Sequence, residues 1–219
     1  MSFQIYDFRK DLKNVLVTPE IRSRFLFMKS GQKVDLQNKA AGHSHDLGYE
    51  IFLIMQGKVR GLIDGEEGIL GAGQLCIAAP HQTHAFEVIG NEDVIMYLSV
   101  TPHIQPTHTF YSELGRRLPH KFQPNSSYDL SDLLEDDIES LLDKQVNLTE
   151  SLKETINKFS VIQKELVNSM KTKSKTSEPD DEMHSLRDQL WDEMIGVFQE
   201  TVLVADVWNT VSPHLAKEQ

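Results

Sequence analysis

The chain has 219 residues, a formal net charge of −11 and a single cysteine, Cys76. This length is sufficient for a substantial hydrophobic core, whereas one cysteine excludes an intramolecular disulfide and any site built from several thiolates. The acidic balance argues against a protein that binds nucleic acid by neutralising phosphates. Cys76 itself lies in an apolar stretch, where we expect an inert core thiol.

Charge and composition change near residue 124. Residues 1–124 contain thirteen Lys and Arg and thirteen Asp and Glu, whereas residues 125–219 contain nine and twenty. Eleven of the twelve glycines and six of the eight prolines also lie in the first segment. We therefore expect two domains of different architecture, residues 1–124 and residues 125–219. The first is neutral in sum, so no strong field is expected to steer a charged substrate towards it.

The first segment has the pattern of β structure. Its apolar runs are short, rich in aromatic and β-branched residues, and separated by glycines. One alternating run ends at Asp64-Gly65, a dipeptide typical of a tight hairpin turn. This pattern predicts a β-sandwich or barrel. The expected strands lie at Arg24–Met28, Tyr49–Met55, Lys58–Ile63, Ile69–Leu70, Gln74–Ala79 and Asp93–Val100.

The second segment has the pattern of helices. Neither proline nor glycine occurs between residues 131 and 170, and apolar residues recur there at steps of three, four or seven. We expect helices at about 131–170 and 182–209, joined by the polar linker Lys171–Asp181 into a hairpin. The apolar stripes favour packing within this hairpin or across a dimer. The alternative is an arm that binds a partner.

Three histidines and one glutamate form a candidate metal site. On an extended segment, alternation points His43 and His45 to one face. Glu50 begins an apolar strand, where an ionised carboxylate is costly unless it is paired or binds a metal. With His84, these side chains offer nitrogen and oxygen ligands suited to Fe, Mn, Ni, Co or Zn as a divalent ion.

A pocket is expected beside these ligands. Phe52 and Ile54 share the strand face of Glu50 and are expected to shape an apolar small-molecule site. Tyr49 should point away from it. Two further histidines, His103 and His108, lie in the segment 101–109 after a strand. This segment either closes the mouth of the pocket and contacts substrate or, as we favour, forms a proline-fixed edge with solvated histidines.

His81 lies three residues before His84 and has two interpretations. Histidine tolerates a positive φ better than most residues, so His81 can occupy a tight turn. Alternatively, it serves as an acid–base group at the rim of the pocket.

The spacing of the candidate ligands resembles a known family. His43-Ser44-His45, four residues, Glu50, six residues and Gly57 resemble the first motif of the cupin superfamily, and the ten residues between Gly73 and His84 match its second. The resemblance covers about residues 25–105. It implies a jelly-roll barrel, or double-stranded β-helix, in which His43, His45, Glu50 and His84 hold one divalent metal ion. The chain is thus expected to be mainly β, with an α-helical hairpin after the barrel.

The resemblance also implies a function. We expect a metal-dependent enzyme acting on a small organic substrate, an Fe(II)-type dioxygenase or other oxidoreductase, with Glu50 and His81 as candidate catalytic groups. The alternatives are a non-oxidative isomerase or lyase, a non-catalytic ligand-binding or sensor module, and a structural protein. Cupins commonly pair, so a homodimer is expected. The sequence shows no signal-peptide pattern and no apolar run of about 18 residues, so we expect a cytoplasmic protein without membrane or nucleic-acid partners.

Overall fold

The computed structural model describes residues 3–34, 42–131, 134, 136–175 and 180–215. The chain forms two compact units, one of residues 1–133 with 212–219 and one of residues 134–211. The first is built from strands and the second from helices. The domain boundary expected after residue 124 stays a prediction.

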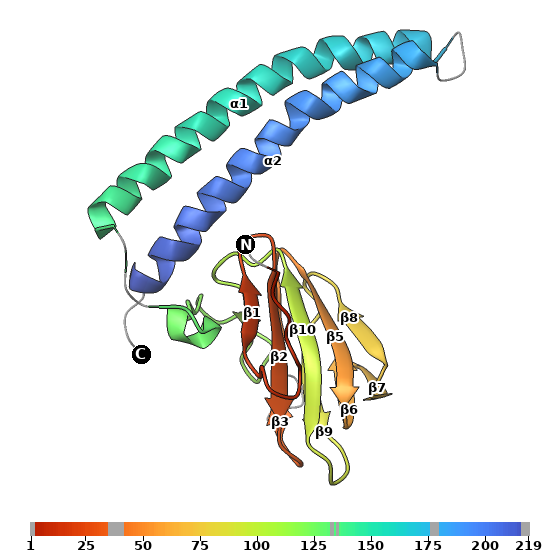
Figure 1. Cartoon of the computed structure of the whole chain (residues 1–219), viewed down its shortest axis with the longest axis vertical. Coiled ribbons are helices and arrows are strands. Elements are labelled where there is room, and N and C mark those ends of the chain that lie inside the picture. The colour runs from red at the N-terminus through yellow and green to blue at the C-terminus, as the bar shows by residue number, and fades with distance from the viewer. Residues whose placement is uncertain (1–2, 35–41, 132–133, 135, 176–179, 216–219) are drawn as a thin grey trace. The chain divides into compact units, whose positions relative to one another are not determined.

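The strands form two antiparallel sheets (Figure 1). In order, the first sheet contains β1 (Asn14–Val17), β2 (Arg22–Met28), β10 (Val94–Thr101), β5 (Tyr49–Gln56) and β8 (Leu75–Ala78). The second contains β11 (Thr109–Phe110), β4 (His43–Ser44), β9 (His84–Val88), β6 (Lys58–Ile63) and β7 (Glu66–Gly71), with β3 (Lys33–Val34) beside β9. This sandwich confirms the expected β architecture.

Alternation along β5 positions the functional face. Glu50, Phe52 and Ile54 are buried, whereas Tyr49 is exposed, as the sequence predicts. The inward side chains of β5 join those of β2, β6 and β10 in one apolar core. The fully buried members of this core are Met28, Ile54, Val59, Val94, Met96 and Val100.

Five strands were not expected from the sequence, namely β1, β3, β4, β9 and β11. Three of them, β3, β4 and β11, have two residues each and offer too little alternation to be recognised. The five-residue β9 is buried at four of its positions, so its sequence does not alternate. The expected hairpin between β6 and β7 is present, and φ is positive at both Asp64 and Gly65.

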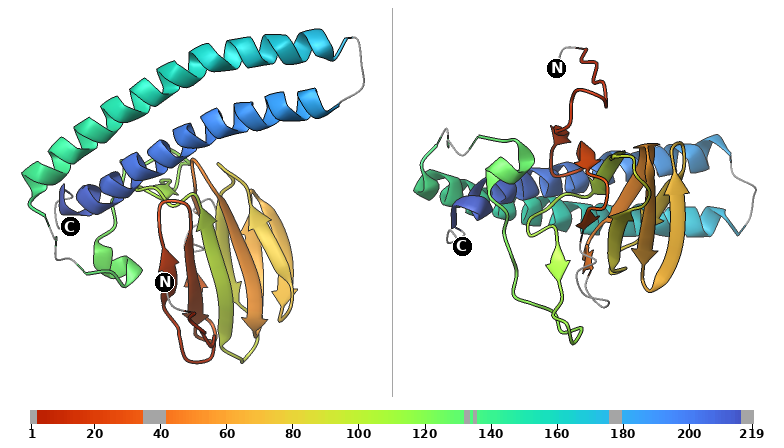
Figure 2. Two further views of the ribbon diagram at one scale, coloured as in Figure 1. Left: turned by 45° about the horizontal axis from the view of Figure 1, so that its top comes forward. Right: turned by 90° about the horizontal axis from the view of Figure 1, so that it is seen from below.

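The second unit is an antiparallel pair of long helices, seen from two sides in Figure 2. Helix α1 (Ile138–Lys173) begins after Asp137, whose carboxylate accepts a hydrogen bond from the Ser140 backbone N–H at 2.9 Å. This cap places the start at 138, later than the expected 131. Helix α2 (Asp181–Leu215) continues beyond the expected end near 209. Residues 176–179 of the predicted linker lie outside the described residues.

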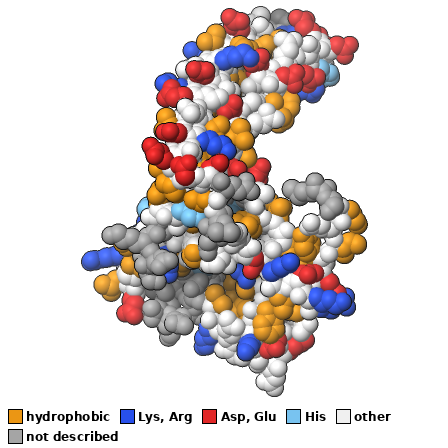
Figure 3. All heavy atoms as spheres, turned by 60° about the vertical axis from the view of Figure 1, so that its left-hand side comes forward, with side chains coloured by type: hydrophobic (Ala, Val, Ile, Leu, Met, Phe, Trp, Pro, Cys, Tyr) orange, Lys and Arg blue, Asp and Glu red, His pale blue; other side chains and the backbone are white. Residues whose placement is uncertain are grey.

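Contacts along the hairpin hold the two helices together. Leu141 of α1 packs on Val207 and Val211 of α2, and Lys158 forms a 3.0 Å ion pair with Glu193. Acidic side chains are prominent over the helices on the face drawn in Figure 3, in agreement with the twenty Asp and Glu of residues 125–219. No helix within the described ranges is both long and apolar enough to cross a membrane.

The outward face of β5 and β8 carries apolar side chains. Ile51 lies opposite Ile77, and Leu53 lies opposite Leu75. Leu75 and Ile77 are about half exposed. The homodimer expected from the sequence stays a prediction.

The turn between β5 and β6 depends on Gly57, the glycine of the first motif. Its φ is +78°, and a Cβ there would lie 2.6 Å from the Asp93 carbonyl oxygen. Gly90 has a similar φ of +86°, but no atom lies within 4 Å of a Cβ placed there. Substitutions at these two glycines can therefore distinguish the cost of backbone strain from that of a steric clash.

We predict that Gly57→Ala destabilises the protein more than Gly90→Ala. Both variants place an L residue in the left-handed region, at about 1–2 kcal/mol. Only Gly57→Ala also forces β5–β6 away from Asp93, which adds on the order of 1–3 kcal/mol. The free energies of unfolding in urea measure the difference, and equal losses for the two variants would contradict the steric role of Gly57.

Candidate metal centre

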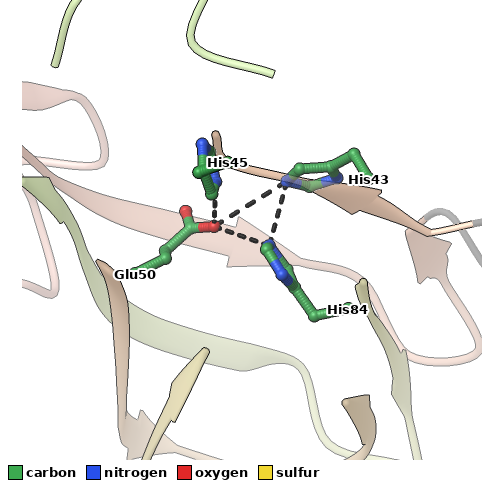
Figure 4. Close-up of side chains that lie close together, drawn as sticks. All are labelled: His43, His45, Glu50 and His84. Carbon is green, nitrogen blue, oxygen red and sulfur yellow. Dashed lines mark hydrogen bonds and ion pairs between the residues drawn. The ribbon is translucent and has the colours of Figure 1, made fainter. Parts of the chain in front are cut away.

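The four candidate ligands converge between the two sheets (Figure 4). His43 and His84 are direct cross-strand neighbours on β4 and β9, and Glu50 reaches them from β5 in the opposite sheet. His45 follows β4, and its ring lies 5.3 Å from the His43 ring. The intervening Ser44 hydroxyl hydrogen-bonds the Tyr111 hydroxyl at 2.8 Å. Alternation thus brings the two histidines to one face, as expected.

One carboxylate oxygen lies at the centre of the cluster. Glu50 Oε2 is 2.7 Å from His45 Nε2 and from His84 Nε2, and 3.7 Å from His43 Nε2. The Nε2 atoms of His43 and His84 are 3.1 Å apart. One ligand atom from each of the four residues lies within 4.8 Å of the others. These side chains therefore form a cluster able to hold a metal ion.

Backbone carbonyls determine which ring nitrogens face the cluster. His45 Nδ1 lies 2.7 Å from the Thr107 carbonyl oxygen, and His84 Nδ1 lies 3.1 Å from that of Gln82. A carbonyl only accepts, so each Nδ1 carries the proton, and in the neutral rings each Nε2 directs a lone pair at Glu50. Lone pairs and a carboxylate at such distances need positive charge among them. Protons on the rings would supply it, and one divalent ion would serve all four groups at once.

Glu50 is held in its ionised form. Its side chain is 2% exposed, and burial alone would raise its pKa. The nearby His43 and hydrogen bonds from the protonated rings of His45 and His84 outweigh burial and lower the pKa of Glu50 well below its ordinary value. The second carboxylate oxygen, Oε1, is 3.8 Å from Nη2 of the buried Arg22.

A cavity of about 320 Å³ adjoins the cluster. His43, Glu50 and His84 form part of its wall. The wall is otherwise largely apolar, and its apolar members include Leu26, Met28, Phe52, Phe86, Met96 and Leu98. This volume lies near the lower end of the range for small-molecule sites.

The two apolar residues expected in the pocket have different positions. Phe52 lines the cavity, with its ring centroid 4.4 Å from that of Phe86 and 5.5 Å from that of His84. Ile54 is fully buried in the core beyond it and is absent from the cavity wall. The sequence assigned both to one face correctly, but depth along the strand separates the wall from the core.

His103 is buried and His108 is only partly exposed, which corrects the favoured interpretation that the histidines of the segment 101–109 are solvated. His108 lines the cavity, and its ring centroid lies 4.6 Å from that of His43. Burial, with His43 and His45 nearby, lowers the pKa of His108 well below its ordinary value. His103 is 2% exposed and lies beside Thr107 and Tyr128, outside the cavity wall. Burial and the nearby Arg22 and His45 lower its pKa to about 3.

His81 occupies the turn position considered for it. Its φ is +68°, and its backbone N–H donates to the His45 carbonyl at 2.8 Å. The side chain is 73% exposed and does not line the cavity. Its role as an acid–base group stays a prediction.

The single cysteine has the inert character expected of it. Cys76 packs against the apolar core and contributes nothing to the wall of the cavity. Burial and the charge of Glu50 raise the pKa of its thiol to about 11, so it stays protonated.

Sequence reasoning missed two arginines in the cavity wall, Arg22 and Arg24. The signal is present in β2, whose sequence RSRFLFM alternates arginine, arginine, leucine and methionine on one face. Leu26 and Met28 must face inward, so period-two alternation also turns both arginines inward. The expected strand began at Arg24, which concealed the pattern.

Residues 33–101 match the model of the cupin domain family. No match was found among curated proteins.

Several solved structures are similar to the chain. An uncharacterized conserved protein with a double-stranded β-helix domain from Klebsiella pneumoniae has 20% identity and a TM-score of 0.44, covering 51% of this chain and 99% of its own. KdgF from a Halomonas species has 20% identity and a TM-score of 0.38, with coverages of 43% and 79%. Salicylate 1,2-dioxygenase from Pseudoaminobacter salicylatoxidans has 14% identity and a TM-score of 0.32, with coverages of 38% and 20%.

The family match covers all four residues of the cluster, His43, His45, Glu50 and His84. The two-sheet antiparallel sandwich agrees with it. Residues 33–101 are therefore a cupin domain, and this part of the chain belongs to the cupin superfamily.

Proposed function

We propose that the protein is a metal-dependent enzyme that converts a small organic substrate by oxidative, Fe(II)-type chemistry. The observation that carries the proposal is the position of a metal-competent cluster in the wall of a largely apolar cavity. A cluster that only stabilised the fold would need no adjoining space. A purely apolar cavity would bind a ligand without offering it reactive groups.

The donor set favours this chemistry. Three imidazoles and one carboxylate suit Fe(II) and the neighbouring divalent metals, and the protonated Cys76 thiol is no competitor for the ion. When bound, such an ion would act as a Lewis acid on a substrate oxygen and, as Fe(II), would add redox chemistry with dioxygen.

The chain's own side chains would prepare the substrate. Phe52 and Phe86 present tilted rings that exclude water from one side of the cavity. His108, kept neutral by burial, has an Nδ1 atom without a hydrogen-bond partner within the described part of the chain. A neutral imidazole of this kind can accept or donate one hydrogen bond to a substrate and fix its orientation.

The metal site is tested by thermal unfolding. After treatment with a chelator, added Co(II) or Zn(II) should raise the Tm of the wild type by about 5–10 °C at roughly 100-fold excess over Kd. His43→Ala removes one ligand at the accessible edge of the cluster and should abolish most of this rise. His120→Ala, an exposed histidine outside the cavity, should retain it. A full metal-induced rise in His43→Ala would show that the ion binds elsewhere.

The reaction is tested by oxygen uptake after anaerobic loading with Fe(II). Over a panel of small acids and phenols, the wild type and His120→Ala should consume oxygen with at least one compound. Glu50→Gln should be slower by about 100-fold or more, because it loses the anionic ligand. Conversion of substrate under argon would instead indicate an isomerase or lyase. Binding without turnover in either atmosphere would indicate a ligand-binding module.

A further inference from the structure

We propose that the cavity selects a small monocarboxylic acid with an apolar body, and that Arg24 holds its carboxylate. The inference deepens the proposed function, on which it rests, by naming the chemical class of the substrate. It depends on the two arginines that β2 turns into the cavity and on the partners that they have there.

The Arg22 side chain already faces a charged partner, Glu50. It is 6% exposed, and its Nη2 lies 3.8 Å from Glu50 Oε1. Its guanidinium carbon also lies 5.5 Å from the centroid of the Tyr128 ring. Arg22 therefore balances the charge of Glu50, and its Nε, like that of Arg24, is buried without a hydrogen-bond partner in the described part of the chain.

Arg24 has no comparable ion-pair partner within the described residues. Its Nε is buried without a hydrogen-bond partner, and no ion pair or hydrogen bond of its side chain is found within the residues that the structure describes. The carboxylate of Asp129, which attracts Arg24 through space, is held by Asn14, whose backbone N–H and side-chain amide donate to it at 2.7 and 2.9 Å. Burial, followed by repulsion from Arg22, lowers the pKa of Arg24, yet an arginine keeps its charge in proteins.

The charges of the cavity wall do not balance. Arg22 and Arg24 contribute two positive charges, and Glu50 contributes the only carboxylate among the described wall residues. Binding of a divalent ion would increase the excess of positive charge in the cavity wall. A partly buried cation without a partner is costly, and a bound anion removes that cost.

The guanidinium determines which anion fits. Its planar fork matches the two oxygens of a carboxylate and makes paired charge-assisted hydrogen bonds. Beyond Arg24, the same strand continues into the cavity with Leu26 and Met28, and Met96 and Leu98 of β10 lie alongside. A ligand anchored at Arg24 thus lies with its body along apolar wall and its carboxylate nearest the cluster, because Arg22 and Glu50 share the next inward row of the sheet, opposite Val100.

The volume of the cavity further restricts the class of ligand. The cavity of about 320 Å³ accommodates a single ring or a short aliphatic chain in addition to a carboxylate. Because Arg22 faces Glu50, a second carboxylate placed at Arg22 would be repelled by the Glu50 carboxylate. The class is therefore an apolar monocarboxylate rather than a diacid.

Calorimetric titration of the full chain under argon tests the inference without requiring turnover. Benzoate and hexanoate should bind, whereas benzamide and hexanamide, which have the same shape but no charge, should bind at least tenfold more weakly. Acetate, which has no apolar body, should also bind at least tenfold more weakly. Equal affinity of the acids and their amides would overturn the proposal.

Substitution of the arginine locates the anion site. Arg24→Gln should weaken benzoate at least tenfold and leave benzamide unchanged, so that the amide also reports an intact cavity. Arg116→Gln removes the same charge from an exposed position outside the cavity and should leave both affinities unchanged. The Tm of ligand-free Arg24→Gln should equal or exceed that of the wild type, because an unpaired cation is removed. Undiminished benzoate binding in Arg24→Gln would overturn the assignment.

The outcomes separate this inference from the proposed function. Arg24-dependent binding of acids without oxygen uptake would support the ligand class and contradict oxidative catalysis. Oxygen uptake with neutral compounds, together with equal binding of acids and amides, would support catalysis and overturn the ligand class.

Discussion

The barrel is organised around one buried carboxylate. Glu50 comes from one sheet and meets three imidazoles carried by or next to β4 and β9 in the other, while Arg22 approaches its second oxygen. Isolated burial of that charge would cost several kcal/mol, so the strands must be held in the one register that surrounds it with partners. The Thr107 and Gln82 carbonyls in turn fix the orientation of the His45 and His84 rings. The cavity is the space left beside this arrangement.

Net charge describes the two parts of the chain poorly when taken alone. Residues 1–124 are neutral in sum, which predicts that no strong field steers a charged substrate towards this segment. Within the cavity wall, however, two arginines face one glutamate, and burial makes this local imbalance matter more than the distant surface charges. The absence of a strong steering field stays a prediction, and a total over 124 residues carries no information on which side chains line the cavity.

Much of the fold and of the cluster can be predicted from the sequence. Particular residues show which features cannot. Period two assigned Glu50 and Phe52 inward and Tyr49 outward, and the spacing from His43 to Gly57 identified the cluster before its geometry was known. Two-residue strands such as β4 have no period to detect, and the depth that separates Phe52 from Ile54 is a property of packing. The same limit applies to His108, whose burial arises from segments distant in the chain.

The central claim is that one divalent ion is held by His43, His45, Glu50 and His84. X-ray absorption of the Fe(II)- or Co(II)-loaded protein tests it most directly. The account predicts the scattering of three imidazoles with additional oxygen, and the loss of one imidazole in His84→Ala. A sulfur ligand, or a spectrum with oxygen ligands only, would contradict it.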